Sequence, residues 1–404
     1  IDYGAQYDEL YVPTREGFTF LGWYSADGTQ YTDANGNAVG NHVCTTDGFK
    51  LYSRWTPKTF NLKYNAFRPN DSAGAVTAGT VGNLPTPNPQ VLKFGVESSI
   101  SLTAPTLTGY TFSGWSETYG GAKVYDKGQT LSASTVSRMY KDCNGGTYNI
   151  YTTWTANKYK IHFDKNATDA NGSMADMDMV YDVAKNLSEN KFSREGYTFQ
   201  GWNTAKNGSG TSYDDKALVN NLTADPNGTV TLYAQWTANV YTITFLPNGG
   251  SVNPTSKTFT IESTIELPTP TKDSYVFDGW LVTTAEGNWT NGTLYTDSSI
   301  PAGKYGNVTV TAQWHKTVTV HFYSGSKGAV HNQFKITFKN NETAGSVTAP
   351  TSFGTIDGWT ALGWTASTAA SKAVGDAAIK GGTTITVAPA KNEYVYYAVY
   401  TQSQ

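Results

Sequence analysis

The chain repeats one short aromatic phrase, and this repetition limits its possible folds more than any other feature. GYTFSGW at residues 109–115 returns as GFTFLGW at 17–23, GYTFQGW at 196–202 and SYVFDGW at 274–280. A second phrase closes each unit, in the segments LYSRW (51–55), IYTTW (150–154), LYAQW (232–236) and VTAQW (310–314). Because both phrases return once in each unit along the chain, the sequence indicates a tandem array of small modules.

Most units also begin with a segment in which apolar and polar residues alternate. In VYTITF (240–245), Tyr241, Ile243 and Phe245 share one parity and the threonines take the other. This is the pattern of a β-strand with one buried and one solvated face. The equivalent segments are TFNLKY (59–64), KYKIHF (158–163) and TVTVHF (317–322). Turn-rich stretches and a proline-containing lead-in connect each opening strand to the aromatic phrase, so we expect a β-rich α+β protein.

The two phrases place the repeat boundaries. We expect units at residues 1–57, 58–157, 158–239, 240–316 and 317–404. The first unit lacks its opening strand, so residue 1 looks like a cut inside a longer protein. The second carries an insertion near 68–98, and the fifth is divergent, with ALGW at 361–364 as its form of the first phrase and Tyr400 in place of the closing tryptophan. A short helical stretch is predicted around residues 214–222.

These motifs together resemble the Listeria–Bacteroides repeat, also called the internalin B-repeat or Flg_new repeat. The clearest match is residues 158–236, with REGYTFQGW at 194–202 and TLYAQW at 231–236. The resemblance implies β-grasp-like modules in an elongated tandem array. It also implies an extracellular setting, on secreted or wall-attached bacterial proteins that are often adhesins, and it implies no catalytic residues.

The two phrases account for nine tryptophans, which we expect to anchor the cores. Small modules bury little surface and need large apolar side chains. In GYTFSGW, Tyr110 and Phe112 share a parity while Trp115 takes the other, but a bulge at Gly114 would turn Trp115 back to the same face. The expected core tryptophans are Trp23, Trp115, Trp202, Trp280 and Trp364 of the first phrase, with Trp55, Trp154, Trp236 and Trp314 of the second.

Trp289 and Trp359 belong to neither recurring phrase, and they lie in segments whose composition is typical of loops. An exposed aromatic ring beside asparagine, threonine and glycine suits the stacking of a sugar ring. We therefore expect ligand contact at Trp289 and Trp359, and also at Tyr119 in the loop ETYGGAKVYD (117–126). The alternative is that these rings cap a core or fill a contact between neighbouring units.

Composition and motifs exclude several classes of function. The net charge is −3, which does not favour nucleic acid, and no apolar run is long enough for membrane insertion. No HExxH, GxSxG, P-loop or Cys–His spacing occurs, so we expect no enzyme and no cofactor. Residues 33–37 and 169–172 resemble fragments of a calcium loop but also suit turns, which leaves Ca²⁺ open. A bond between Cys44 and Cys143 is likewise left open.

We therefore expect a non-catalytic binding or adhesion region of a bacterial surface or secreted protein. A polysaccharide or host glycan is the favoured partner, because of the aromatic and Asn/Thr/Gly-rich surface. The alternatives are a structural spacer that presents other domains, and an adhesin that binds other surface proteins through strand edges.

Overall fold

The computed structural model describes residues 4, 8–41, 43, 48–69, 81–324, 329–366 and 379–402, with residues 329–331 described by their backbone alone. The chain divides into two compact units. The first comprises residues 1–165, 173–191 and 201–234, and the second residues 166–172, 192–200 and 235–404. Cys44, and with it the question of a Cys44–Cys143 bond, lies outside the described residues.

The secondary structure is almost entirely β. In the first three repeats the elements are β1 (Phe18–Tyr24), β2 (Tyr52–Pro57), β3 (Thr59–Asn65), β4 (Gln90–Lys93), β5 (Ser98–Ser99), β6 (Tyr110–Ser116), β7 (Thr130–Leu131), α1 (Ala133–Asp142), β8 (Thr147–Ala156), β9 (Lys158–Asp164), β10 (Met177–Val180), β11 (Lys185–Asn186), β12 (Tyr197–Asn203), β13 (Ser212–Tyr213), β14 (Leu218–Val219) and β15 (Thr229–Ala238).

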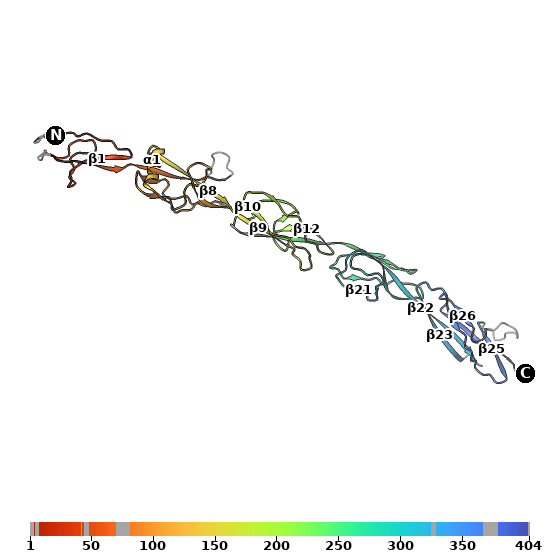
Figure 1. Ribbon diagram of the computed structural model, residues 1–404. Coiled ribbons are helices and arrows are strands. Elements are labelled where there is room, and N and C mark those ends of the chain that lie inside the picture. Colours follow the sequence, from red (N-terminus) through yellow and green to blue (C-terminus); the bar gives the residue numbers. More distant parts are fainter. Residues whose placement is uncertain are drawn as a thin grey trace. The chain divides into compact units, whose positions relative to one another are not determined.

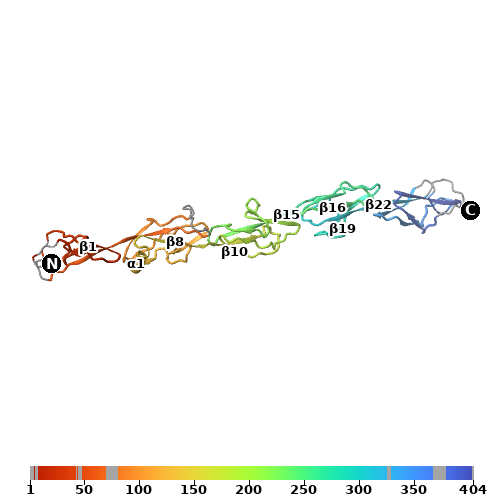
Figure 2. The ribbon, with the colours of Figure 1, turned by 90° about the horizontal axis from the view of Figure 1, so that it is seen from above.

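The fourth and fifth repeats share one long strand, β22, which closes the fourth and opens the fifth (Figures 1 and 2). Their elements are β16 (Tyr241–Leu246), β17 (Ser256–Phe259), β18 (Ile265–Glu266), β19 (Val276–Ala285), β20 (Leu294–Tyr295), β21 (Ser299–Ile300), β22 (Val308–Ser324), β23 (Ala329–Lys339), β24 (Gly345–Thr348), β25 (Trp359–Thr365), β26 (Thr384–Val387) and β27 (Glu393–Gln402). The predicted β-rich fold is confirmed, whereas the β-grasp assignment and the elongated form stay predictions.

One strand order recurs from repeat to repeat. The sheets read β4-β3-β8-β6 in the second repeat, β10-β9-β15-β12-β13 in the third and β17-β16-β22-β19-β20 in the fourth. The opening and closing strands pair in parallel, as β3 with β8 and β16 with β22. The aromatic phrase then pairs antiparallel with the closing strand. The fifth repeat keeps this order through β23, β22, β27 and β25, although its sequence has diverged.

The opening strands bury their apolar face as their alternation predicts. In β9, Tyr159, Ile161 and Phe163 are buried while the intervening residues are exposed. The same parity buries Phe60, Leu62 and Tyr64 in β3. Each of these strands therefore contributes one apolar face to a core and one polar face to solvent.

The glycine of the aromatic phrase forms a β-bulge. The ladder of β6 shifts register between Phe112 and Gly114, and that of β19 shifts between Phe277 and Gly279. Gly114 has φ +144°, and a Cβ there would lie 2.5 Å from the carbonyl oxygen of Tyr125. Glycine is needed both for the backbone conformation and for this close approach. The bulge turns Trp115 into the core, where it is fully buried.

Burial separates the two classes of tryptophan. The bulge tryptophans Trp115, Trp202, Trp280 and Trp364 are at most 1% exposed, and Trp23 is half-buried. Of the closing tryptophans, Trp314 is buried, but Trp55, Trp154 and Trp236 are only half-buried. Four of the nine rings expected in the cores, Trp23, Trp55, Trp154 and Trp236, are therefore only partly buried. The closing ring lies on the predicted face, but at the end of its strand, beyond the centre of the core.

A phenylalanine bridges the two tryptophans within a repeat. The ring centroid of Phe112 lies 5.2 Å from that of Trp115 and 5.7 Å from that of Trp154, both in edge-to-face geometry. Phe277 lies in the same way 5.4 Å from Trp280 and 5.5 Å from Trp314. Such pairs add to the stability that ring burial provides. The three aromatic residues of the two phrases thus form one packing cluster.

The helix is not where the sequence predicted it. Residues 214–222 form a turn followed by β14, whereas α1 lies in the second repeat. The side chain of Ser132 caps α1 by accepting a hydrogen bond from the Thr135 N–H, and Val136 and Met139 are buried against the core. Asn144 and Gly145, both with positive φ, follow the end of α1 at Asp142.

The bulge glycine supplies a direct test of the packing. We expect Gly279→Ala to lower the free energy of unfolding of the fourth repeat by about 2–4 kcal/mol, because φ is +146° and the new Cβ would lie 2.6 Å from the Tyr295 carbonyl oxygen. Hydrogen exchange of the β19 and β22 amides in the whole chain measures the change.

The matched control is Gly292→Ala in the same repeat. Gly292 also has a positive φ, +86°, but no atom lies within 4 Å of its would-be Cβ. Backbone strain alone should cost about 1 kcal/mol there. Equal costs at Gly279 and Gly292 would contradict the bulge as the packing constraint.

Candidate functional site

Trp289 is buried, so the expectation of an exposed ring there is wrong. Its side chain is 6% exposed and its indole Nε1 donates a hydrogen bond to the Gly306 carbonyl at 3.0 Å. The ring packs edge-to-face against Phe259 and Tyr295. Gly287 and Gly306 allow the two loop segments to approach closely enough to enclose it. Trp289 therefore belongs to the core of the fourth repeat, which was the alternative interpretation.

Trp359 is 47% exposed and begins β25. It follows Gly358 as Tyr110 follows Gly109, and both glycines have φ +79°. Trp359 therefore occupies the position of the tyrosine in GYTFSGW. At Gly109 the space of the missing Cβ is filled by the ring of Tyr181, but no described atom lies within 4 Å at Gly358. The exposed ring remains available for contact with another molecule.

Tyr119 lies in a small aromatic cluster on the second repeat. Its side chain is 40% exposed, and its ring contacts Phe67 at 4.8 Å and Tyr151 at 5.7 Å between centroids. Both contacts are edge-to-face, so the ring is held by neighbours on two sides. Tyr119 belongs to the first compact unit, whereas Trp289 and Trp359 belong to the second.

A cluster of ionisable groups joins α1 to the second repeat. Arg138 forms ion pairs with Glu117 at 2.5 Å and with Asp142 at 2.8 Å, and it donates hydrogen bonds to the hydroxyls of Tyr125 and Tyr148. Burial tends to raise the pKa of Glu117, but the hydrogen bonds from Tyr125 and Arg138 outweigh it and hold that pKa below its usual value. Since these groups bond one another, the cluster serves to fix α1 in place.

In the two loops that resemble calcium-site fragments, the aspartate carboxylates accept hydrogen bonds or form ion pairs within the chain. Asp33 accepts hydrogen bonds from the Asn35 and Asn37 N–H groups and from the Asn37 side chain. The bond from the Asn37 side chain is the main reason that the pKa of Asp33 is lowered. Asp169 pairs with Arg194 at 2.9 Å. Across the described part of the chain, no group of three or more His, Cys, Asp or Glu side chains is placed to hold a metal ion.

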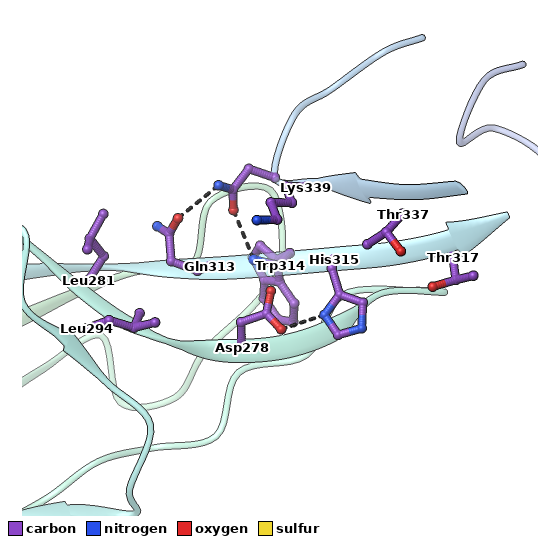
Figure 3. Close-up of a pocket in the computed structure, with 10 residues that line it drawn as sticks. Asp278, Leu281, Leu294, Gln313, Trp314, His315, Thr317, Thr337 and Lys339 are labelled. Carbon is purple, nitrogen blue, oxygen red and sulfur yellow. Dashed lines mark hydrogen bonds and ion pairs between the residues drawn. The ribbon is translucent and has the colours of Figure 1, made fainter. Parts of the chain in front are cut away.

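A pocket with mixed lining lies where the fourth repeat meets the fifth (Figure 3). We call it the junction pocket; its volume is about 500 Å³. It is lined by residues of β19, β20, β22 and β23 and of the turn after β23: Asp278, Leu281, Leu294, Gln313, Trp314, His315, Thr317, Thr337, Lys339 and Asn340. Asp278 and His315 point toward each other across its floor, joined by a hydrogen bond of 2.5 Å.

Sequence reasoning missed the junction pocket. Asp278, Gln313 and Trp314 belong to recurring phrases, but no motif in the sequence places them beside Thr337 and Lys339. The pocket depends on the long β22–β23 ladder, in which His315 faces Lys339. Comparison of the strands in register could have found it, because Lys339 breaks a pattern of acidic residues at that position.

The family model of the Listeria-Bacteroides repeat domain matches residues 1–52, 77–137, 159–235 and 241–313. These matches cover more than half of the chain. The chain belongs to the Listeria-Bacteroides repeat family. The fifth repeat lies outside the match but has the same strand order as the matched repeats of this chain.

Curated relatives carry similar segments. A protein described as a putative Gly-rich membrane protein, from Evansella cellulosilytica, is 36% identical over 176 residues, which is 43% of this chain and 19% of that protein. Internalin H of Listeria monocytogenes is 40% identical over 128 residues, 30% of this chain and 20% of its own length. This repeat chain thus spans about a fifth of the length of these two relatives.

Among solved structures, the pilus adhesin SpaC of Lactobacillus rhamnosus GG aligns with 93% of this chain and 48% of its own, at 9% identity and a TM-score of 0.13. Within the described residues, no helix is long and apolar enough to cross a membrane.

Trp289 and Trp359 should respond differently to replacement by alanine. We expect Trp289→Ala to destabilise the fourth repeat by about 3–5 kcal/mol, since it empties a core position. Trp359→Ala should cost about 1 kcal/mol or less, because half of its side chain is already in solvent. Thermal unfolding of the two variants, followed by hydrogen exchange of each repeat, measures the difference. A comparable loss from both changes would contradict this assignment.

Proposed function

We propose that this chain is a non-catalytic, extracellular spacer region that holds other parts of a bacterial surface protein at a distance. The observation that carries the proposal is that the first four repeats are joined to one another by the same contacts. A spacer needs junctions that resist bending, and in repeat arrays each unit is stabilised by its neighbours. The names of the relatives, membrane proteins and an internalin, support a location at the cell surface.

One backbone hydrogen bond recurs at three junctions. The residue three positions after the closing tryptophan donates its N–H to the carbonyl of the glycine that begins the aromatic phrase. The bonds run from Lys58 to Gly17 at 2.8 Å, from Asn157 to Gly109 at 2.9 Å, and from Asn239 to Gly196 at 2.8 Å. Each bond therefore attaches the linker to the repeat that precedes it.

The same glycine admits a side chain of the following repeat. At Gly17 the space of a Cβ is taken by the Phe94 ring, at Gly109 by the Tyr181 ring and at Gly196 by Ile261. Each of these glycines has φ between +75° and +79°. Because any larger residue would push the next repeat away, glycine at this position serves the junction as well as the turn.

Side-chain hydrogen bonds complete two of the junctions. The Tyr110 hydroxyl donates to Asp182 at 2.6 Å, and the Tyr197 hydroxyl donates to Glu262 at 2.8 Å. The threonine after each tyrosine donates to the linker asparagine, Thr111 to Asn157 at 2.7 Å and Thr198 to Asn239 at 2.6 Å. Burial, followed by the bond to Asp182, raises the pKa of Tyr110, so this hydroxyl stays protonated as a donor.

The junction between the second and third repeats offers a test of stiffness. Spin labels at Val91→Cys and Leu218→Cys, both exposed sites, report the distance between these repeats in a chain that lacks the native cysteines. We expect a narrow distance distribution by double electron–electron resonance. Tyr110→Phe with Asn157→Ala should broaden it, because the side-chain bonds from Tyr110 to Asp182 and from Asn157 to the Ala224 carbonyl, which cross the junction, are both lost.

Tyr119→Phe is the matched control, since it removes a tyrosine hydroxyl of the same repeat away from the junction. It should leave the distribution unchanged. A broad distribution in the parent chain, or no change in the double variant, would count against the spacer function.

Contact with a polysaccharide or host glycan through Trp359 is a second candidate function. It is favoured by the exposure of that ring, and Tyr119 is a weaker candidate of the same kind. Affinity electrophoresis in gels that contain starch, xylan or mucin tests it: retardation of the parent chain should be lost in Trp359→Ala. Equal mobility of the two proteins on every gel would reject this role of Trp359.

A further inference from the structure

Strand register identifies one position that is acidic at two junctions and basic at a third. The second residue of each of the opening segments 158–163, 240–245 and 317–322 pairs with a residue of the next strand: Tyr159 with Met179, Tyr241 with Phe259, and Val318 with Ile336. Three residues after these partners come Asp182, Glu262 and Lys339. Counted from this register the three residues correspond, although β23 extends to Lys339 whereas Asp182 and Glu262 lie in the turns after β10 and β17.

The change to lysine removes an acceptor from the junction and leaves a cation in its place. Asp182 and Glu262 accept hydrogen bonds from the tyrosines of the preceding repeat, which a lysine ammonium cannot do. The Lys339 Nζ makes no ion pair or hydrogen bond with the residues that the structure describes. Lys339 instead lines the junction pocket (Figure 3). This lysine is therefore available to an anionic group from outside the chain.

The polar side chains beside Lys339 are held in place by one another. Asn340 donates to the Gln313 side chain at 2.8 Å and accepts from the Trp314 N–H at 2.9 Å. Asp278 and His315 are bonded to each other and are each about one-third exposed. The pocket thus offers a preorganised carboxylate and imidazole, with the hydroxyls of Thr317 and Thr337 nearby. Carboxylates and hydroxyls are suitable partners for sugar hydroxyl groups.

The other end of the pocket is apolar. Leu281 and Leu294 line it on β19 and β20, apart from Lys339 (Figure 3). A volume of about 500 Å³ with an apolar wall and a few fixed polar groups falls in the range of small-molecule sites. The leucines suit the C–H face of a sugar ring.

The charged side chains that line the pocket decide which ligand suits it. Lys339 is the only lysine or arginine among the lining residues. The pocket itself contains one carboxylate, Asp278, which is paired with His315. Because the Asp278 carboxylate is already paired, the Lys339 ammonium is left to interact with a ligand, and it suits a ligand unit with a single negative charge. A phosphate group would be better matched by several cations or N–H donors.

We infer that the junction pocket binds one carboxylate-bearing sugar unit of an acidic polysaccharide. Lys339 pairs with the sugar carboxylate, Asp278 and the two threonines bond its hydroxyls, and Leu281 and Leu294 contact its apolar face. This site is separate from Trp359 and does not depend on the spacer function.

Isothermal titration calorimetry of the whole 404-residue chain tests the inference, with short oligomers of galacturonate, of alginate and of hyaluronate as probes. We expect at least one of them to bind. The carboxyl-reduced, neutral form of that oligomer should bind about tenfold more weakly or not at all, because a charge-assisted hydrogen bond is lost. Lys339→Gln should weaken binding of the acidic oligomer by a similar factor, and Lys339→Glu should abolish it.

Lys335→Gln is the matched control. Lys335 lies on the same strand and the same face, carries the same charge and does not line the pocket. It should leave the affinity within about twofold of the parent. Equal losses at Lys335 and Lys339 would show non-specific attraction and overturn the inference. It would also be overturned if none of the three oligomers bound, or if glycerol phosphate polymers alone bound in a Lys339-dependent way.

Discussion

The β-bulge at the glycine of the aromatic phrase is the constraint on which the rest of each repeat depends. Without it, the tryptophan after that glycine would project from the opposite face of its strand. With it, Trp115 lies against Tyr64 at 4.8 Å and against Phe112 at 5.2 Å. Burial of one such ring contributes about 4–6 kcal/mol by area. For a module of this size, that is a large part of its stability.

The same aromatic phrase also forms the junctions between repeats. Its last residues face the core, whereas its first glycine and the aromatic residue that follows it face the next repeat. Tyr110 contacts Tyr181 and Asp182 in this way, and Tyr197 contacts Glu262. One seven-residue segment therefore specifies both the packing of a repeat and its connection to the next. This dual role explains physically why the whole phrase recurs with so few changes.

Much of the fold could be predicted from the sequence, because alternation and recurrence are local signals. The parity of Phe112 and Trp115 predicted the bulge at Gly114, and the structure confirms it. Parity does not say how far a core extends along a strand, so the partial exposure of Trp154 and Trp236 was missed. Composition suggested an exposed loop at Trp289, but two glycines let that loop fold back over the ring.

The candidate pocket could not be predicted from motifs, because its residues come from strands that the fold brings together. Leu281 and Leu294 lie on β19 and β20, while Thr337 and Lys339 lie on β23. Their proximity follows from the pairing of β22 with both β19 and β23. Only a comparison of register between repeats shows that Lys339 replaces an acidic residue.

The central claim is that the glycine bulge, and not the closing strand, places the anchoring tryptophan of the second to fifth repeats. Hydroxyl-radical footprinting with mass spectrometry measures the solvent accessibility of each tryptophan in the intact chain. The account predicts protection of Trp115, Trp202, Trp280 and Trp364, intermediate oxidation of Trp55, Trp154 and Trp236, and the fastest oxidation at Trp359. Oxidation of the four bulge tryptophans as fast as that of Trp359 would contradict it.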